Sequence, residues 1–194
     1  MRTHARTVPH IFGCCLLAAT STLVFAQAAA PTPPKPAIGA AIPPSQIYGK
    51  LLSGIEQEFV SAAEAMPEDK YDFAPPVTAG EFKGVRTFAE QVKHVTEANV
   101  YYFRDPTKPL VDSRADIEKL KTKAEIVKAL KDSMALAHTY IAGMTPENVF
   151  VWTGSGTRGG MAAQGIAHML DHYGQMVEYL RMNGIVPPAS RRSM

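Results

Sequence analysis

The chain has 194 residues, and 46% of them are apolar, which suits one domain with a real core and excludes disorder throughout. The formal net charge is +2, and without Arg2 and Arg6, which fall in a leader-like segment, 18 basic residues face 18 acidic ones. A neutral chain lacks the basic surface by which proteins bind nucleic acid, so we exclude nucleic acid as a partner.

Residues 1–26 are predicted to form a secretory signal peptide. Arg2 and Arg6 precede an apolar run over residues 11–25, and the small residues that follow offer a cleavage site near Ala26 or Ala28. A permanent membrane anchor needs about 20 apolar residues, and this run is shorter. We therefore expect an exported protein, periplasmic or secreted, with no stable membrane insertion after cleavage.

The mature chain that follows the leader is predicted to lack thiols. Both cysteines, Cys14 and Cys15, lie in the leader, which excludes disulfides and thiolate metal ligands from the folded domain. An alanine- and proline-rich linker is expected over residues 27–45. The domain itself is expected at residues 46–186, followed by a short tail at 187–194.

Four stretches carry apolar residues at spacings of three and four, which indicates amphipathic helices. Two of these stretches open on a capping box, Thr87 to Glu90 and Thr122 to Glu125, in which a threonine hydroxyl and a glutamate satisfy open backbone amides. The expected class is all-α, a four-helix bundle with a long crossover loop before the last helix. The long connections leave the helix order open. The four helices are expected at residues 46–66, 87–104, 122–143 and 161–182.

The loop at residues 145–160 contains Trp152, the single tryptophan, and several glycines. It could cover one end of the bundle beside a site, or it could be a flexible crossover with Trp152 against the core. The sequence does not choose between these two interpretations.

The last helix carries two histidines, His168 and His172, four positions apart. Residues at i and i+4 lie on one helix face with Cβ atoms about 5–6 Å apart, so their imidazoles can meet one ion. On a helical wheel they form a third strip with Gln175 and Tyr179, beside a solvent arc and an aliphatic arc. The predicted aliphatic arc consists of Ile166, Leu170, Tyr173, Val177 and Leu180.

A third ligand would come from another helix, and the spacing alone offers both His94 and His138. Each histidine flanks the apolar stripe of its helix. Either could instead be a partly exposed histidine that contacts a neighbouring helix.

The stretch from His168 to Pro188, with its paired histidines, Gly174-Gln175, Leu180-Arg181 and the final Gly184, resembles the closing helix of the DinB-like (damage-inducible) family. Residues 87–94, Thr-Phe-Ala-Glu-Gln-Val-Lys-His, are similar to the segment that bears that family's remaining ligand. The resemblance implies a four-helix bundle with a crossed helix order and one divalent metal. The ligands that it implies are His94, His168 and His172.

Three imidazoles leave a coordination position open, as in catalytic metal sites. We expect zinc, with nickel or iron as alternatives, because imidazole suits all three ions. The resemblance implies transfer of a low-molecular-weight thiol or hydrolysis of an amide, with a small-molecule substrate that Gln175 and Tyr179 could orient. A non-catalytic metal-binding or stress-response protein is the alternative, and a metal-free module that pairs into a homodimer is a third hypothesis.

Overall fold

The computed structural model describes residues 35–105, 107–109 and 113–191. The predicted signal peptide and residues 27–34 of the predicted linker lie outside these residues. The fold is the compact unit that begins at Ile38. Within the part of the chain that the structure describes, no helix combines the length and the apolar character needed to cross a membrane.

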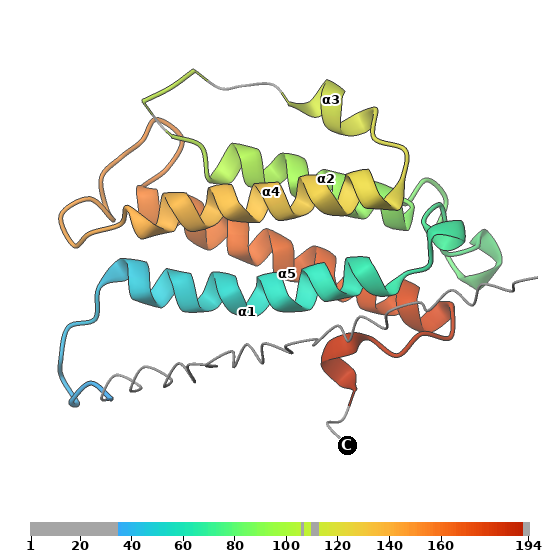
Figure 1. Cartoon of the computed structure of the whole chain (residues 1–194), viewed down its shortest axis with the longest axis horizontal. Helices are drawn as coiled ribbons and strands as arrows, with labels where there is room; N and C mark the ends of the chain where they lie inside the picture. The colour runs from blue at the N-terminus through green and yellow to red at the C-terminus, as the bar shows by residue number, and fades with distance from the viewer. Residues whose placement is uncertain (1–34, 106, 110–112, 192–194) are drawn as a thin grey trace, which may run out of the picture. The chain divides into compact units, whose positions relative to one another are not determined.

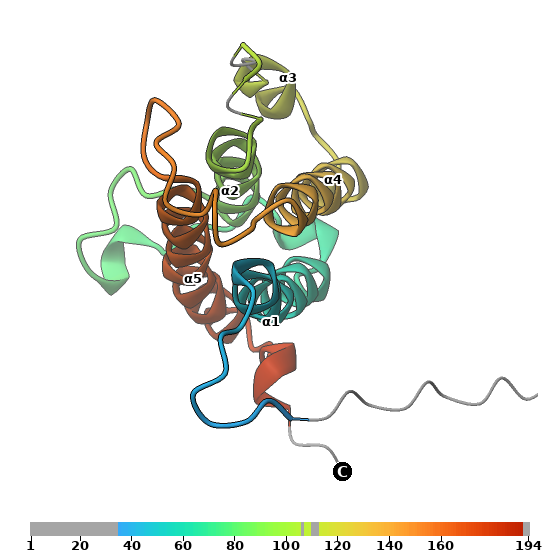
Figure 2. The same cartoon turned by 90° about the vertical axis from the view of Figure 1, so that its left-hand side faces the viewer.

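Four long helices form a bundle in which α1 and α5 run in one direction and α2 and α4 in the other (Figure 1). The described residues contain no strand. Contacts between helices link α1 to α4 and α5, and α2 to the same two helices. The order around the bundle is therefore α1, α4, α2, α5, as the end-on view in Figure 2 shows. α1 lies across the diagonal from α2, and α4 lies across the diagonal from α5, so the order is crossed, as the family resemblance implied. The bounds are α1 Pro44–Ala65, α2 Phe88–Tyr102, α4 Lys123–Ala142 and α5 Arg158–Met182.

Short elements fill the connections between these helices. The 3-10 helices η1 (Glu68–Lys70) and η2 (Val77–Ala79) lie between α1 and α2, and the five-residue helix α3 (Arg114–Glu118), which we did not predict, precedes α4. Lys93 of α2 donates to the carbonyl of Glu118 at 3.2 Å and so ties α3 to the bundle. After α5, the 3-10 helix η3 (Pro188–Ser190) contacts α1.

Both predicted capping boxes are confirmed. Thr87 Oγ1 accepts from Glu90 N at 3.2 Å while Glu90 Oε2 accepts from Thr87 N at 2.7 Å, and Thr122 and Glu125 make the same pair of bonds. These reciprocal bonds fix the first residues of α2 and α4.

The start of α5 lies three residues before the predicted Met161. Thr157 caps the helix by accepting from Gly160 N at 3.1 Å. Gly159 and Gly160 looked like loop residues because glycine disfavours helices, but Gly159 is needed for close packing. A Cβ there would lie 2.7 Å from Val149 Cγ2.

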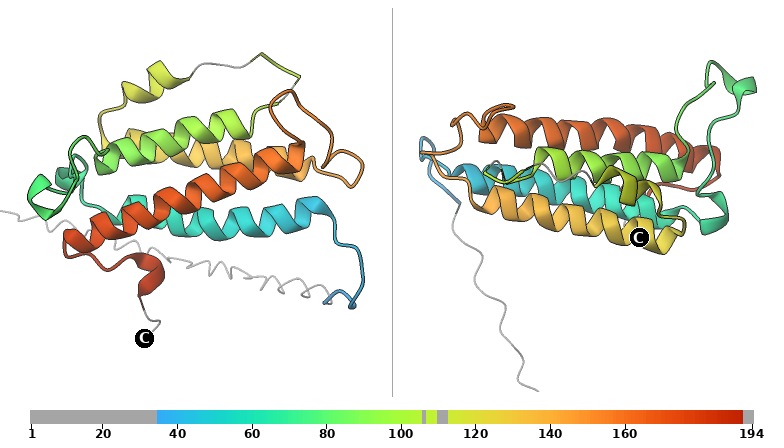
Figure 3. Two further views of the ribbon diagram at one scale, coloured as in Figure 1. Left: turned by 180° about the vertical axis from the view of Figure 1, so that it is seen from behind. Right: turned by 90° about the horizontal axis from the view of Figure 1, so that it is seen from above.

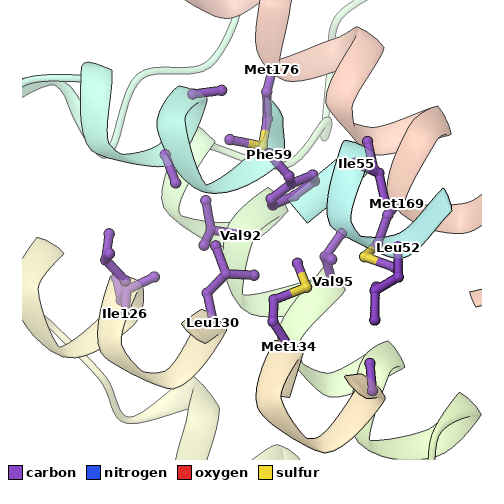
Figure 4. Close-up of a cluster of buried hydrophobic side chains, with 14 of the residues drawn as sticks. Leu52, Ile55, Phe59, Val92, Val95, Ile126, Leu130, Met134, Met169 and Met176 are labelled. Atoms are coloured by element: carbon purple, nitrogen blue, oxygen red, sulfur yellow. The ribbon is translucent and has the colours of Figure 1, made fainter. Parts of the chain in front are cut away.

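The core lies between the four helices and is rich in methionine (Figure 4). These unbranched side chains adapt to irregular gaps, which helps them to fill a bundle interior. The fully buried side chains include Leu52, Phe59, Val92, Val95, Leu130, Met134, Met169 and Met176.

The predicted apolar arc of α5 is wrong at Leu170, whose exposed fraction is 51%. The neighbouring Met169 is completely buried, as is Met176 one repeat further on. The helix therefore turns its row of methionines toward the core. The predicted apolar face, which was based on leucine, tyrosine and valine, differs from this buried face by a rotation about the helix axis. In this orientation His172 lies on the buried side of α5.

This orientation predicts opposite responses at two adjacent positions. Leu170→Gln should change the free energy of unfolding by less than about 0.5 kcal/mol, because the side chain already contacts water. Met169→Gln should cost about 1–3 kcal/mol, because an amide would be buried without a partner. Urea denaturation of both variants measures the difference, and a reversed order would contradict the orientation of α5.

Candidate metal centre

Three histidines from two helices converge between α2 and α5, which lie side by side (Figure 3). His94 lies in the middle of α2, and His168 and His172 are one turn apart on α5. One ring nitrogen from each histidine lies within 4.8 Å of the others, and the ring centroids are 4.5–5.0 Å apart. The structure thus brings together the three residues that the sequence and the family resemblance proposed.

The spacing of two of these nitrogens fits a tetrahedral ion. The Nε2 atoms of His94 and His168 are 3.2 Å apart. Two nitrogens bonded to zinc at about 2.0–2.1 Å with a tetrahedral angle lie about 3.3–3.4 Å apart. The distance between this pair therefore fits two ligands of one ion.

His138, the competing candidate, lies elsewhere in the bundle. It belongs to α4, which lies across the diagonal from α5, and its Nε2 is 2.6 Å from Glu56 Oε2 of α1. This contact with a neighbouring helix is the structural role that the sequence left open for it.

Gln91 is a contributor to the site that the sequence analysis missed. Its side chain is only 2% exposed, and its Oε1 lies 2.5 Å from Nδ1 of His172. Its Nε2 donates to Gln175 Oε1 at 2.8 Å. Gln91 precedes His94 by three positions and therefore shares its helix face. Its position as a polar residue beside an apolar stripe could have indicated from the sequence that it belongs to the site.

The two residues expected to lie beside the metal differ in what they contact. Gln175 reaches His172 through Gln91. The Tyr179 hydroxyl donates to the carbonyl of Arg86 at 2.9 Å, and its ring packs edge-on against Phe73. Tyr179 thus anchors the segment that enters α2, and its hydroxyl is committed to the backbone.

His168 has a ring nitrogen without a protein partner. Its Nδ1 is buried and has no hydrogen-bond partner among the described residues, and its ring lies 5.9 Å from that of Tyr102. A buried polar atom without a partner costs about 1–3 kcal/mol, so hydrogen bonds alone do not account for the orientation of this ring. The orientation of the His168 ring is instead explained by the position of its other nitrogen, which lies close to His94 and His172.

All three histidines are neutral near pH 7. The pKa of His94 and of His172 is lowered to about 4, chiefly by burial and also by Arg86 and the neighbouring imidazoles. The pKa of His168 is also lowered, chiefly by burial. Neutral imidazoles keep the lone pair that a metal ligand requires.

These shifts predict how acid affects the metal-free protein. An unfolded histidine has a pKa of 6.5, whereas His94 and His172 titrate near 4 when folded, so the unfolded chain binds protons first. The stability contributed by the neutral histidines is complete above pH 6.5 and falls as the pH drops toward 4. Urea midpoints of chelator-treated protein should therefore decrease from about pH 7 to about pH 5. A His94→Gln/His172→Gln variant should show a flatter profile, and an equal slope would contradict the assignment.

A groove of about 1340 Å³ runs past the histidines, lined by His94 and His168 together with residues of α3 and of the segment before α2. Glu97, which the sequence analysis also missed, lines it one turn beyond His94 and has an 18% exposed side chain. Burial raises the pKa of Glu97, and the nearby Glu118 raises it further, while Arg114 Nε lies 4.0 Å away. The groove therefore has His94 and His168 in its lining, together with a carboxyl group whose pKa is raised.

Comparisons with known proteins agree on one family. The family model described as the DinB superfamily matches residues 51–176. The crystal structure of an Exiguobacterium sibiricum protein, described as a member of the DinB family, is similar with a TM-score of 0.56 at 16% identity. The aligned part covers 72% of this chain and 91% of that one, and at this identity the likeness concerns the fold. None of the curated proteins matches the chain.

Proposed function

Because the chain belongs to the DinB superfamily, whose model matches most of the bundle, we propose that it is an exported protein that binds a divalent metal ion through His94, His168 and His172. The observation that supports this most strongly is the 3.2 Å separation of the His94 and His168 Nε2 atoms, with His172 in the same cluster. Zinc is the proposed ion, with nickel or iron as alternatives.

An ion held by three neutral imidazoles keeps an open position, where it lowers the pKa of a bound water or thiol and so supplies a nucleophile near neutral pH. We propose a metal-dependent transferase of low-molecular-weight thiols or a hydrolase. The groove beside His94 and His168 supports a small-molecule substrate. Glu97, whose pKa is raised, could exchange a proton with a substrate bound there.

The groove lining carries both signs of charge, with Arg86, Lys93 and Arg114 beside Glu90, Glu97, Glu118 and Glu178. We propose a substrate with an anionic group because Arg86 acts on all three histidines. The positive charges of Arg86 and Arg114 act on His94, and Arg86 also acts on His168 and His172. The carboxylate that opposes them at the two α5 histidines is Asp171. Because imidazoles bring no negative charge, a bound dication would make this end of the groove more positive.

Export and assembly are separate proposals. The N-terminal pattern of Arg2 and Arg6 before an apolar run supports export to the periplasm or beyond. A homodimer is proposed because exposed apolar side chains remain on the bundle, among them Ile47 and Leu51 of α1.

The metal content of the purified protein tests the proposal directly. Elemental analysis should find about one ion per chain in the wild type, with loss in His94→Ala, His168→Ala and His172→Ala. His138→Ala is the matched control, because His138 faces Glu56 instead, and it should keep the ion. Equal metal content in all four variants, or none in the wild type, would refute the proposed site.

A second measurement separates a catalytic ion from a structural one. The alternative function, a non-catalytic metal-binding or stress-response protein, is supported by the burial of His172. Thermal unfolding with and without a chelator distinguishes the two. A bundle that stays folded after chelation supports the functional open site, and one that collapses supports the structural role.

A further inference from the structure

A chain of hydrogen bonds connects His172 to a carboxylate on the surface of α5. His172 Nδ1 contacts Gln91 Oε1 at 2.5 Å, Gln91 Nε2 donates to Gln175 Oε1 at 2.8 Å, and Gln175 Nε2 donates to Asp171 Oδ2 at 3.3 Å. Asp171 and Gln175 are four positions apart on α5, which lets the two side chains meet. The chain crosses from α5 to α2 and back.

The carboxylate gives this chain a direction. An ionised aspartate only accepts hydrogen bonds, whereas each glutamine amide has one accepting oxygen and one donating nitrogen. Gln175 must therefore turn its NH₂ group toward Asp171, which turns its oxygen toward Gln91. Gln91 must then offer its NH₂ group to Gln175 and its oxygen to His172.

The last link decides which ring nitrogen of His172 carries the proton. An amide oxygen can only accept, so Nδ1 of His172 must be the donor. The lone pair of the neutral imidazole is then on Nε2. Neither His94 nor His168 shows such a chain among the described residues, and Nδ1 of His168 has no partner.

We propose that Asp171 is a positioning residue that fixes His172 in its Nδ1–H tautomer through Gln175 and Gln91. Its link to metal binding rests on the function proposed above, because the Nε2 lone pair is then the one left for an ion. The tautomer itself requires no metal. Without a carboxylate at its outer end the chain loses its fixed direction, and the two amides can turn together and present an NH₂ group to Nδ1.

The tautomer is measurable in the metal-free protein. Long-range ¹H–¹⁵N correlation spectra of histidine-labelled full chain, recorded at about pH 8 where the imidazoles are neutral, distinguish the two ring nitrogens. The wild type should show His172 protonated at Nδ1. Asp171→Asn should show a growing share of the Nε2–H form, because asparagine can also donate. Asp171→Glu should restore the wild-type signal, and Asp132→Asn, an exposed aspartate paired with Lys128 on α4, should leave it unchanged.

Metal competition with a chelator gives a second readout on the same variants. The affinity should fall up to about tenfold in Asp171→Asn and recover in Asp171→Glu, as for partners that orient ligating histidines. A wild-type tautomer in Asp171→Asn overturns the inference, even when the protein binds metal. A tautomer that responds as described in a protein without metal affinity upholds the inference and overturns the proposed function.

Discussion

Gly165→Leu is expected to lower the free energy of unfolding by about 3 kcal/mol or more and to remove metal binding. A Cβ at Gly165 would lie 2.7 Å from Phe103 Cζ and 3.1 Å from Tyr102 Cβ. Phe103 is completely buried and cannot move aside without disturbing the core. Gly165 is one turn before His168, so any side chain there separates α5 from α2 at the height of the histidines.

Gly174 provides the matched control on the same helix. No atom lies within 4 Å of a Cβ at Gly174. Gly174→Leu should therefore keep the ion and gain up to about 1 kcal/mol from helix propensity. Urea denaturation and metal analysis of both variants make the comparison, and a Gly165→Leu protein with wild-type stability would show that close approach of α2 and α5 is not required.

Gln91→Leu is expected to weaken metal binding by about 10- to 100-fold, the usual loss when the partner of a ligating histidine is removed. Leucine has nearly the volume of glutamine but cannot accept from Nδ1 of His172 or donate to Gln175. His172 would keep its place in the core but lose the bond that fixes its ring and its tautomer.

Competition with a chelator measures this loss. Gln57→Leu makes the same change at an exposed position of α1 and should leave the affinity unchanged. Stability should fall by about 1–3 kcal/mol in Gln91→Leu, because a buried ring nitrogen loses its partner. Equal affinity in the two variants would mean that Gln91 only fills space.

Local signals predicted much of this molecule. The capping boxes at Thr87 and Thr122 placed two helix starts, because reciprocal side-chain bonds depend on residues three apart. The pairing of His168 and His172 followed from helix periodicity in the same way. The choice between His94 and His138 could not be made from spacing. It depends on the order of the helices around the bundle, which decides which histidine lies beside α5. Only the family resemblance supplied that order.

Packing explains what the sequence could not predict. The orientation of α5 depends on how methionines fill the centre of the bundle, so a wheel weighted by leucine misplaced Leu170. Gln91 and Glu97 were missed because each looked like an ordinary polar residue of α2. Gln91 contacts His172 and Glu97 lies near α3, and such contacts between elements cannot be predicted from the periodicity of one helix.

The crossed helix order also affects when the site can form. His94 and His168 are 74 positions apart, and the second of them belongs to the last long helix of the chain. Contacts of such separation form late because closing a long loop costs chain entropy first. A growing chain that still lacks α5 has one of the three histidines, so we expect the ion to enter after synthesis is complete. The metal that the protein acquires would then be set by the compartment in which the last helix docks.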